Sequence, residues 1–136
     1  MLWVSSLWTV GYLVAPTLFV TLPDRVLAGT IAGSMFRVEA WWSVACGLVL
    51  FALHATRKPR PNRVLWLIAA MLACTLLGYF ALHPFMAALR EAAGPSGIMT
   101  ADARMQFGVL HGVSSGLYLI ASLLGLALVL QSRDKE

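Results

Sequence analysis

The sequence predicts an all-α integral membrane protein, a four-helix bundle with amphipathic helical segments in its two outer loops. Of its 136 residues, 60% are hydrophobic and 12% are charged, whereas a soluble domain has about 25% charged residues. A chain of this size has too little interior to hide so much apolar surface from water, so lipid is the solvent that suits it. Four apolar stretches approach the roughly 20 residues that cross a bilayer as a helix. We therefore expect a single transmembrane domain over residues 1–136.

The four expected spans follow one another along the whole chain. The first covers residues 3–21, includes Pro16 and lacks the basic start of a secretory signal, so we expect an uncleaved span. The second covers residues 38–54, the third 64–82 and the fourth 107–130. Backbone polar groups must be paired inside the hydrocarbon, which makes these spans helices.

The start of the second span has two interpretations. Pro23 and Asp24 suit the first turn of a helix, and the segment that follows is apolar and rich in small residues. Either residues 23–36 form a separate helix at the outer surface, or the second span extends back to residue 23. We favour one long helix, kinked or tilted near Arg37, because no helix breaker interrupts the segment.

The second outer loop is similar. Residues 84–93 form an amphipathic, helix-forming stretch, which the glycines and proline of residues 94–97 end. The segment that starts at Thr100 is typical of a helix cap. Both halves of the chain therefore have the order span, outer amphipathic stretch, span, which suggests a duplicated hairpin.

The distribution of charge predicts the orientation in the membrane. The segment 56–63 holds four positive charges, no negative charge and two prolines, and it separates the second and third spans. With the tail, it contributes six basic residues to one side: Arg57, Lys58, Arg60, Arg63, Arg133 and Lys135. Lys and Arg near spans favour the cytoplasm, so we expect a multi-pass protein of the bacterial inner membrane with both termini cytoplasmic. The basic segment suits anionic lipid headgroups and is too short to indicate nucleic acid.

A polar stripe follows one face of the fourth span. His111, Ser114, Ser115 and Tyr118 stand at positions i, i+3, i+4 and i+7. Such a stripe is costly against lipid, so it should face the bundle interior or a wet cavity. It either forms a hydrogen-bond network between helices or lines a solute path or ligand site.

Glycines at helical spacing predict close helix packing. Gly108, Gly112 and Gly116 lie beside the polar stripe, and Gly29 and Gly33 share the same four-residue spacing. Small residues let helix backbones approach closely in membranes. The stripe on the fourth span packs either within the monomer or at an interface of a homo-oligomer.

Further candidates are charged or metal-binding side chains. Arg37 and Glu39 stand at the outer end of the second span. At positions i and i+2 of a helix, their side chains do not face each other. Each charged group either extends to the lipid headgroups or has a function inside the membrane. His83 and His111 are expected near the same outer surface, with Met86, Met99 or Met105 nearby. Imidazole with soft sulfur suits copper, and two histidines suit haem, although no HxxxH spacing is present.

Three segments carry a family resemblance. They are YLVAPTLF at 12–19, AGTIAGSMF at 28–36 and FGVLHGVSS at 107–115. Together they resemble a bacterial membrane family of unknown function related to human transmembrane protein 205, domain of unknown function 4149. The resemblance implies a four-span helical bundle and no established activity. It makes seven matching positions functional candidates: Pro16, Phe19, Gly29, Gly33, Phe36, His111 and Ser114.

No catalytic arrangement or phosphate-binding loop is indicated by residue spacing, so we do not expect an enzyme. The leading hypothesis is a small membrane protein that binds or passes a small solute or ion. A haem- or copper-binding membrane protein is the first alternative. A structural or assembly subunit that contacts a membrane-protein partner through its glycine faces is the second.

Overall fold

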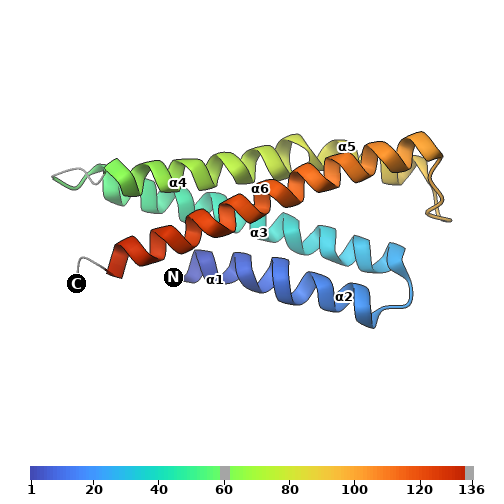
Figure 1. Cartoon of the computed structure of the whole chain (residues 1–136), viewed down its shortest axis with the longest axis horizontal. Coiled ribbons are helices and arrows are strands. Elements are labelled where there is room, and N and C mark those ends of the chain that lie inside the picture. Colours follow the sequence, from blue (N-terminus) through green and yellow to red (C-terminus); the bar gives the residue numbers. More distant parts are fainter. Residues whose placement is uncertain (59–61, 134–136) are drawn as a thin grey trace.

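The described chain forms four helical rods that run back and forth along one axis (Figure 1). The computed structural model describes residues 1–58 and 62–133, with side chains as far as Gln131. The first rod comprises α1 (Leu2–Trp8), the π-helical η1 (Thr9–Val14) and α2 (Ala15–Thr21). The second is α3 (Arg25–Ala55). The third comprises α4 (Asn62–Thr75), the π-helical η2 (Leu76–Ala81) and α5 (His83–Ala92), and the fourth is α6 (Ala101–Arg133).

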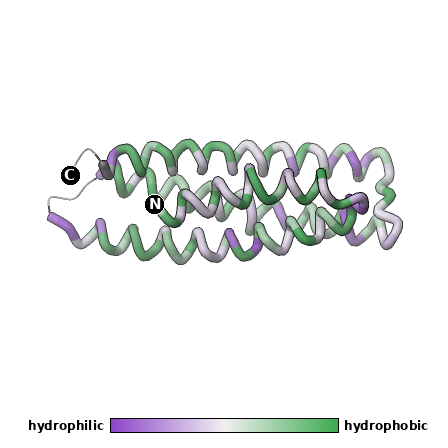
Figure 2. The backbone as a smooth tube through the Cα atoms, turned by 90° about the horizontal axis from the view of Figure 1, so that it is seen from below, coloured by the Kyte–Doolittle hydropathy of each residue, from purple (hydrophilic) through white to green (hydrophobic). Residues whose placement is uncertain are grey.

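All four rods are long and apolar enough to cross a membrane. Hydrophobic residues follow each rod along most of its length, and hydrophilic residues gather mainly near the rod ends (Figure 2). Large apolar side chains cover the outside of the bundle; Trp66, for example, is 76% exposed. Such a surface suits lipid and not water. The chain is a multi-pass membrane protein, and the predicted all-α four-helix bundle is confirmed.

The rods extend well beyond the apolar runs that the sequence marks as spans. α3 runs without interruption from Arg25, so residues 25–36 belong to the second rod and do not form a separate helix. The amphipathic stretch 84–93 is helical and continues the third rod as α5. α6 begins at Ala101, ahead of the apolar run that starts at residue 107. Polar residues near the rod ends thus remain helical instead of forming loops.

Local capping explains where these helices begin and end. Asp24 caps α3 by accepting hydrogen bonds from the backbone nitrogens of Val26 at 2.8 Å and Leu27 at 3.1 Å. Thr100 Oγ1 accepts from the Ala103 nitrogen at 3.2 Å at the start of α6. Gly94 has a φ angle of 67°, a conformation that stops a helix and that other residues rarely adopt.

Four helix ends lie together at one end of the bundle. The start of α1, the end of α3, the start of α4 and the end of α6 lie together there (Figure 1). Of the basic residues used to predict orientation, Arg57, Lys58, Arg63 and Arg133 belong to this end, and Arg60 and Lys135 lie outside the described residues. We call this half of the bundle the closed half, because its core is tightly packed around Leu7, Ile68 and Met71.

The opposite half, which we call the hollow half, contains the cavity described below. The first and third rods each change from α-helical to π-helical hydrogen bonds at η1 and η2, near the inner end of the cavity. A proline follows each π-helical segment within a few residues, Pro16 after η1 and Pro84 after η2. Proline lacks a backbone donor and disturbs the preceding turn, which accounts for the wider turns. The wider turns place Gly11, Tyr12, Gly78 and Tyr79 on the cavity wall.

Candidate functional site

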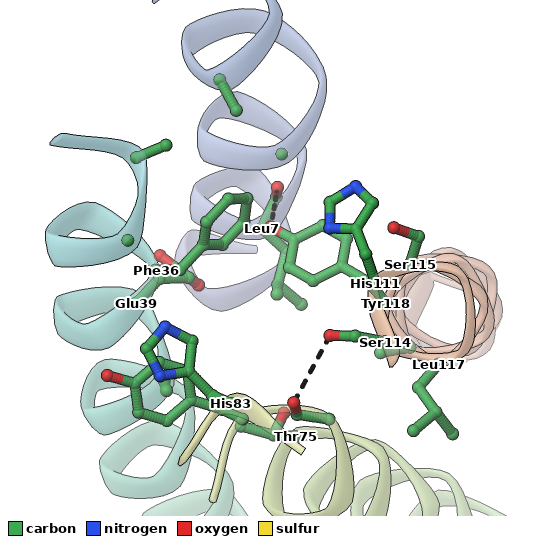
Figure 3. Close-up of a pocket in the computed structure, with 18 of the residues that line it drawn as sticks. Leu7, Phe36, Glu39, Thr75, His83, His111, Ser114, Ser115, Leu117 and Tyr118 are labelled. Atoms are coloured by element: carbon green, nitrogen blue, oxygen red, sulfur yellow. Dashed lines mark hydrogen bonds between the residues drawn. The ribbon is translucent and has the colours of Figure 1, made fainter. Parts of the chain in front are cut away.

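A cavity of about 550 Å³ lies between the four rods in the hollow half. Its walls are mostly apolar and aromatic, and polar side chains line it from all four rods; Figure 3 shows Glu39, His83 and His111 from three of them. Ligand pockets for small molecules fall in the range of roughly 300–1,000 Å³ and have this kind of lining. The cavity is therefore of a size and composition that suits a small molecule.

The cavity reaches the surface of the bundle between the first and fourth rods. α1 packs against both α3 and α6, but α2 packs against α3 and not against α6. The lining there consists of side chains at exposed positions, among them Phe19 on α2 and His111 and Ser115 on α6. These rods thus meet in the closed half and separate in the hollow half, which gives the cavity a side that faces the surrounding lipid.

Glu39 is a buried carboxyl group on the cavity wall. Its side chain is 5% exposed. Ser6 Oγ donates to Glu39 Oε1 at 3.0 Å, and Ser43 Oγ donates to the same oxygen at 3.3 Å. Ser6 Oγ also lies 2.8 Å from the Trp3 carbonyl oxygen, so its single hydrogen serves two acceptors. The carboxyl group is held in place through one oxygen only.

The second oxygen of this carboxyl group is turned toward the cavity. Glu39 Oε2 accepts no hydrogen bond from the described residues. Among those residues, Trp3 Nε1 is the only side-chain nitrogen or oxygen that is both fully enclosed and without a hydrogen bond, so Oε2 is not fully enclosed. Oε2 therefore keeps contact with open space, and the space beside Glu39 is the cavity. This oxygen is available to a bound group.

Two basic side chains lie farther from the closed half. The guanidinium of Arg90 is 5.5 Å from the centre of the Phe107 ring, a cation–π contact. His83 stacks on Tyr79 with ring centres 4.6 Å apart. Both line the cavity opposite Gly33, where a Cβ atom would lie 3.7 Å from Arg90 Nη1 and 3.9 Å from His83 Nε2. Within the described residues, no carboxylate pairs with Arg90 and neither side chain makes a hydrogen bond.

Tyr118 ties α6 to the first rod at the bottom of the cavity. Its hydroxyl donates to the Leu7 carbonyl oxygen at 2.6 Å, just before η1 begins (Figure 3). Its ring covers Gly11 so closely that a Cβ atom at that position would overlap it. The Phe36 ring meets the Tyr118 ring edge-on at 5.6 Å. Tyr118 therefore forms part of the floor and links the cavity to the closed half.

All four members of the predicted polar stripe line the cavity. Tyr118 makes the bond to Leu7, and Ser114 Oγ donates to the Gly78 carbonyl oxygen at 3.4 Å, a long contact. His111 and Ser115 are exposed and make no side-chain hydrogen bond to any described residue. The stripe thus divides between helix-to-helix bonds at its inner end and unpaired groups at its outer end.

The two histidines of the metal hypothesis lie on different sides of the cavity. His83 projects from the third rod, and His111 projects from α6, where it stacks on Phe107 at 6.1 Å (Figure 3). No group of three or more His, Cys, Asp or Glu side chains in residues 1–58 and 62–133 is arranged to hold a metal ion. The geometry offers no ready-made ligand set for copper.

The glycine stripe does not pack within the monomer, and that interpretation is wrong. A Cβ atom added at Gly108, Gly112 or Gly116 would meet nothing within 4 Å, because this face of α6 has no neighbouring rod. Gly29 and Gly33 line the cavity instead of a helix contact. The glycines that do allow close packing are Gly11, Gly47 and Gly125. An added Cβ atom would crowd Tyr118 at Gly11 and Leu72 at Gly47. At Gly125 it would crowd Val4 and Met71.

Arg37 and Glu39 differ in their surroundings, as their spacing predicts. Arg37 is exposed and does not line the cavity. Because α3 begins at Arg25, Glu39 lies near the middle of this helix. Buried between rods, this carboxyl group does not snorkel to the headgroups.

The positions behind the family resemblance converge on one place. The first and second motifs contribute cavity-lining residues from α2 and α3, and the third contributes two from α6. All seven line the cavity: Pro16, Phe19, Gly29, Gly33, Phe36, His111 and Ser114.

Sequence patterns missed three polar members of the site: Ser6, Ser43 and Arg90. Ser43 follows Glu39 by four residues on the same helix face, which is a signal that could have identified it. Ser6 and Arg90 come from other rods, and no local pattern links them to Glu39 or Gly33.

Comparison with known proteins identifies a family and no activity. The family model described as domain of unknown function DUF4149 matches residues 1–95, which include Glu39, His83 and Arg90 but end before His111 and Ser114. No curated protein and no solved structure matches the chain. Because the match covers most of the sequence, the chain belongs to the DUF4149 family.

Proposed function

We propose that this membrane protein binds a small amphiphilic solute in the cavity of its hollow half. The observation that carries the proposal is that the seven positions behind the sequence resemblance converge on one cavity of about 550 Å³, five of them within the residues that the family model matches. Packing of a bundle needs no such space, and a pocket with apolar walls and a few polar groups suits binding. The closed half then acts as the rigid base of the site.

The architecture also supports a route to the site. Because α2 and α6 separate, a solute reaches the cavity from the side of the bundle, past Phe19, His111 and Ser115. Glycine at positions 29 and 33 leaves space on the α3 wall. The same opening allows release, so binding and passage of a solute use one site.

We also propose the orientation of the protein. The basic segment supports an orientation with both termini in the cytoplasm, and the sequence resemblance to a bacterial membrane family supports the inner membrane as the location. The hollow half then lies toward the outer leaflet, since it is remote from the chain ends.

A pair of matched glycine variants tests the binding proposal. Gly29→Leu places a side chain in the cavity, whereas Gly108→Leu places one on the open face of α6; neither position has an atom within 4 Å of an added Cβ. Small molecules are released by organic solvent from each purified protein and quantified by mass spectrometry. We expect a molecule retained by the unaltered protein and by Gly108→Leu, and lost from Gly29→Leu.

Two results would contradict the proposal. The first is equal retention by both variants, which would place the molecule outside the cavity. The second is that the unaltered protein releases no molecule whose amount is proportional to the amount of protein. Circular dichroism of each variant checks that the helical bundle is intact.

The assembly alternative retains one specific observation. Gly108, Gly112 and Gly116 form a smooth face of α6 that no rod of the same chain covers. Glycine faces of this spacing associate in membranes through close backbone contact. We therefore propose a second copy of this chain as the partner of that face.

A further inference from the structure

The cavity carries two charged groups of opposite sign that the protein leaves unpaired. Glu39 is almost fully buried and presents Oε2 to the cavity without a donor. Arg90 lines the same cavity without a carboxylate partner among the described residues. Glu39 Oε2 has no donor, and the half-exposed guanidinium of Arg90 contacts only the Phe107 ring, so each of these groups is able to bind a group of opposite charge.

Glu39 and Arg90 are too far apart to neutralise each other. Arg90 Nη1 lies beside Gly33, and Glu39 is six residues farther along α3. At a rise of 1.5 Å per residue, those two positions are separated by about 9 Å along the helix axis. The α3 wall between them includes the aromatic ring of Phe36.

We infer that the solute is a zwitterion, with an ammonium group bound at Glu39 and an acidic group bound at Arg90, joined by a short apolar chain. This inference rests on the proposed function and specifies its substrate class. The ammonium group donates to Glu39 Oε2, whose orientation Ser6 and Ser43 fix through Oε1. The acid accepts from the guanidinium of Arg90, with His83 beside it as a further donor.

The order of the two charges along the cavity follows from this arrangement. The cation-binding end adjoins the closed half and is deeply buried, and the anion-binding end lies toward α5 and the far end of the bundle. The aromatic rings of Tyr118 and Phe36 lie at the inner end of the cavity. The face of an aromatic ring attracts a cation, which favours an ammonium group at this end. A solute with one charge alone leaves the other protein charge unpaired.

Three probes of equal chain length test this inference: ω-aminooctanoate, octanoate and octylamine. Their binding is measured by calorimetric titration of the purified protein in a nonionic detergent, with empty micelles subtracted. We expect ω-aminooctanoate to bind about tenfold more tightly than either singly charged probe, because it alone satisfies both protein charges. Equal affinity for all three, or no binding of any, would overturn the inference.

Variants assign each end. Glu39→Gln keeps an acceptor for Ser6 and Ser43, and we expect it to weaken ω-aminooctanoate by about tenfold and leave octanoate unchanged. Arg90→Gln should weaken ω-aminooctanoate and octanoate and leave octylamine unchanged. Arg104→Gln removes an exposed arginine that does not line the cavity and should change none of the three. A zwitterion affinity that is unchanged in both cavity variants would overturn the assignment.

Gly29→Leu separates failure of this inference from failure of the proposed function. If all three probes bind equally and Gly29→Leu abolishes their binding, the cavity is a binding site and the zwitterion inference is wrong. If the probes bind and Gly29→Leu has no effect, the probes lie outside the cavity and both proposals fail for them.

Discussion

Replacement of Gly11 by alanine tests whether the floor of the cavity is built as described. Gly11 lies in η1 directly beneath the Tyr118 ring, and an added Cβ atom would overlap ring atoms. The ring is not free to move away, because its hydroxyl is bonded to the Leu7 carbonyl oxygen at 2.6 Å. Gly11→Ala must therefore displace the ring or the first rod.

The magnitude follows from three contributions. Overpacking of a tight contact costs about 1–3 kcal/mol. Loss of the Tyr118–Leu7 hydrogen bond adds about 0.5–1.5 kcal/mol. The gain in helix propensity from glycine to alanine offsets up to about 1 kcal/mol. We expect Gly11→Ala to lower the free energy of unfolding by about 1–3 kcal/mol.

Reversible unfolding in mixed detergent and sodium dodecyl sulfate micelles, followed by far-ultraviolet circular dichroism, measures this quantity. Gly112→Ala is the matched control, because its added Cβ atom meets nothing within 4 Å and should be neutral or slightly stabilising. A double-mutant cycle with Tyr118→Leu should show that the two sites are coupled by about 1–2 kcal/mol. If Gly11→Ala is as harmless as Gly112→Ala, the described contact between η1 and α6 is wrong.

Three more predictions concern the same architecture. Tyr118→Phe should lower the free energy of unfolding by about 1 kcal/mol, and Ser114→Ala by less, because the Ser114 bond is 3.4 Å long; equal losses in the same unfolding assay would contradict this ranking. In a background with Cys46 and Cys74 replaced by alanine, Gly112→Cys should form disulfide-linked dimers in native membranes. Leu48→Cys, at an exposed position on α3, should not. If Gly112→Cys yields only monomers, the glycine face is not an interface. In the same background, a membrane-impermeant maleimide added to intact cells should label Ser96→Cys and not Lys58→Cys; the reverse pattern would invert the proposed orientation.

Local sequence signals are sufficient for the rods and their caps. The four apolar runs specify the number of spans, and Asp24 and Thr100 mark helix starts through hydrogen bonds to residues two or three positions away. The lengths of the rods were harder to predict. Polar and small residues continue α3 and α6 well past the apolar runs, because a helix end outside hydrocarbon needs no hydrophobic pattern.

The packing contacts could not be predicted from spacing. The glycines at four-residue spacing on α6 are a strong local pattern, but a pattern on one helix does not name its partner. Gly11 and Gly47 have no such pattern, and each is defined by a large side chain far along the chain, Tyr118 or Leu72. Glu39 was singled out as a charge, yet its burial depends on Ser6 from another rod.

The contrast between the two halves of the bundle bears on function through the energetics of membranes. Hydrocarbon gives helices no hydrophobic drive to close a space between them, so a cavity with apolar walls persists at little cost. The polar atoms in that cavity are different, because an unpaired charge away from water is expensive. The chain's own residues hold Glu39 through one oxygen and leave the guanidinium of Arg90 against a single ring. A packed base beneath two polar groups without partners, open toward the lipid, therefore supports the proposal that a bound solute completes the polar contacts of the cavity.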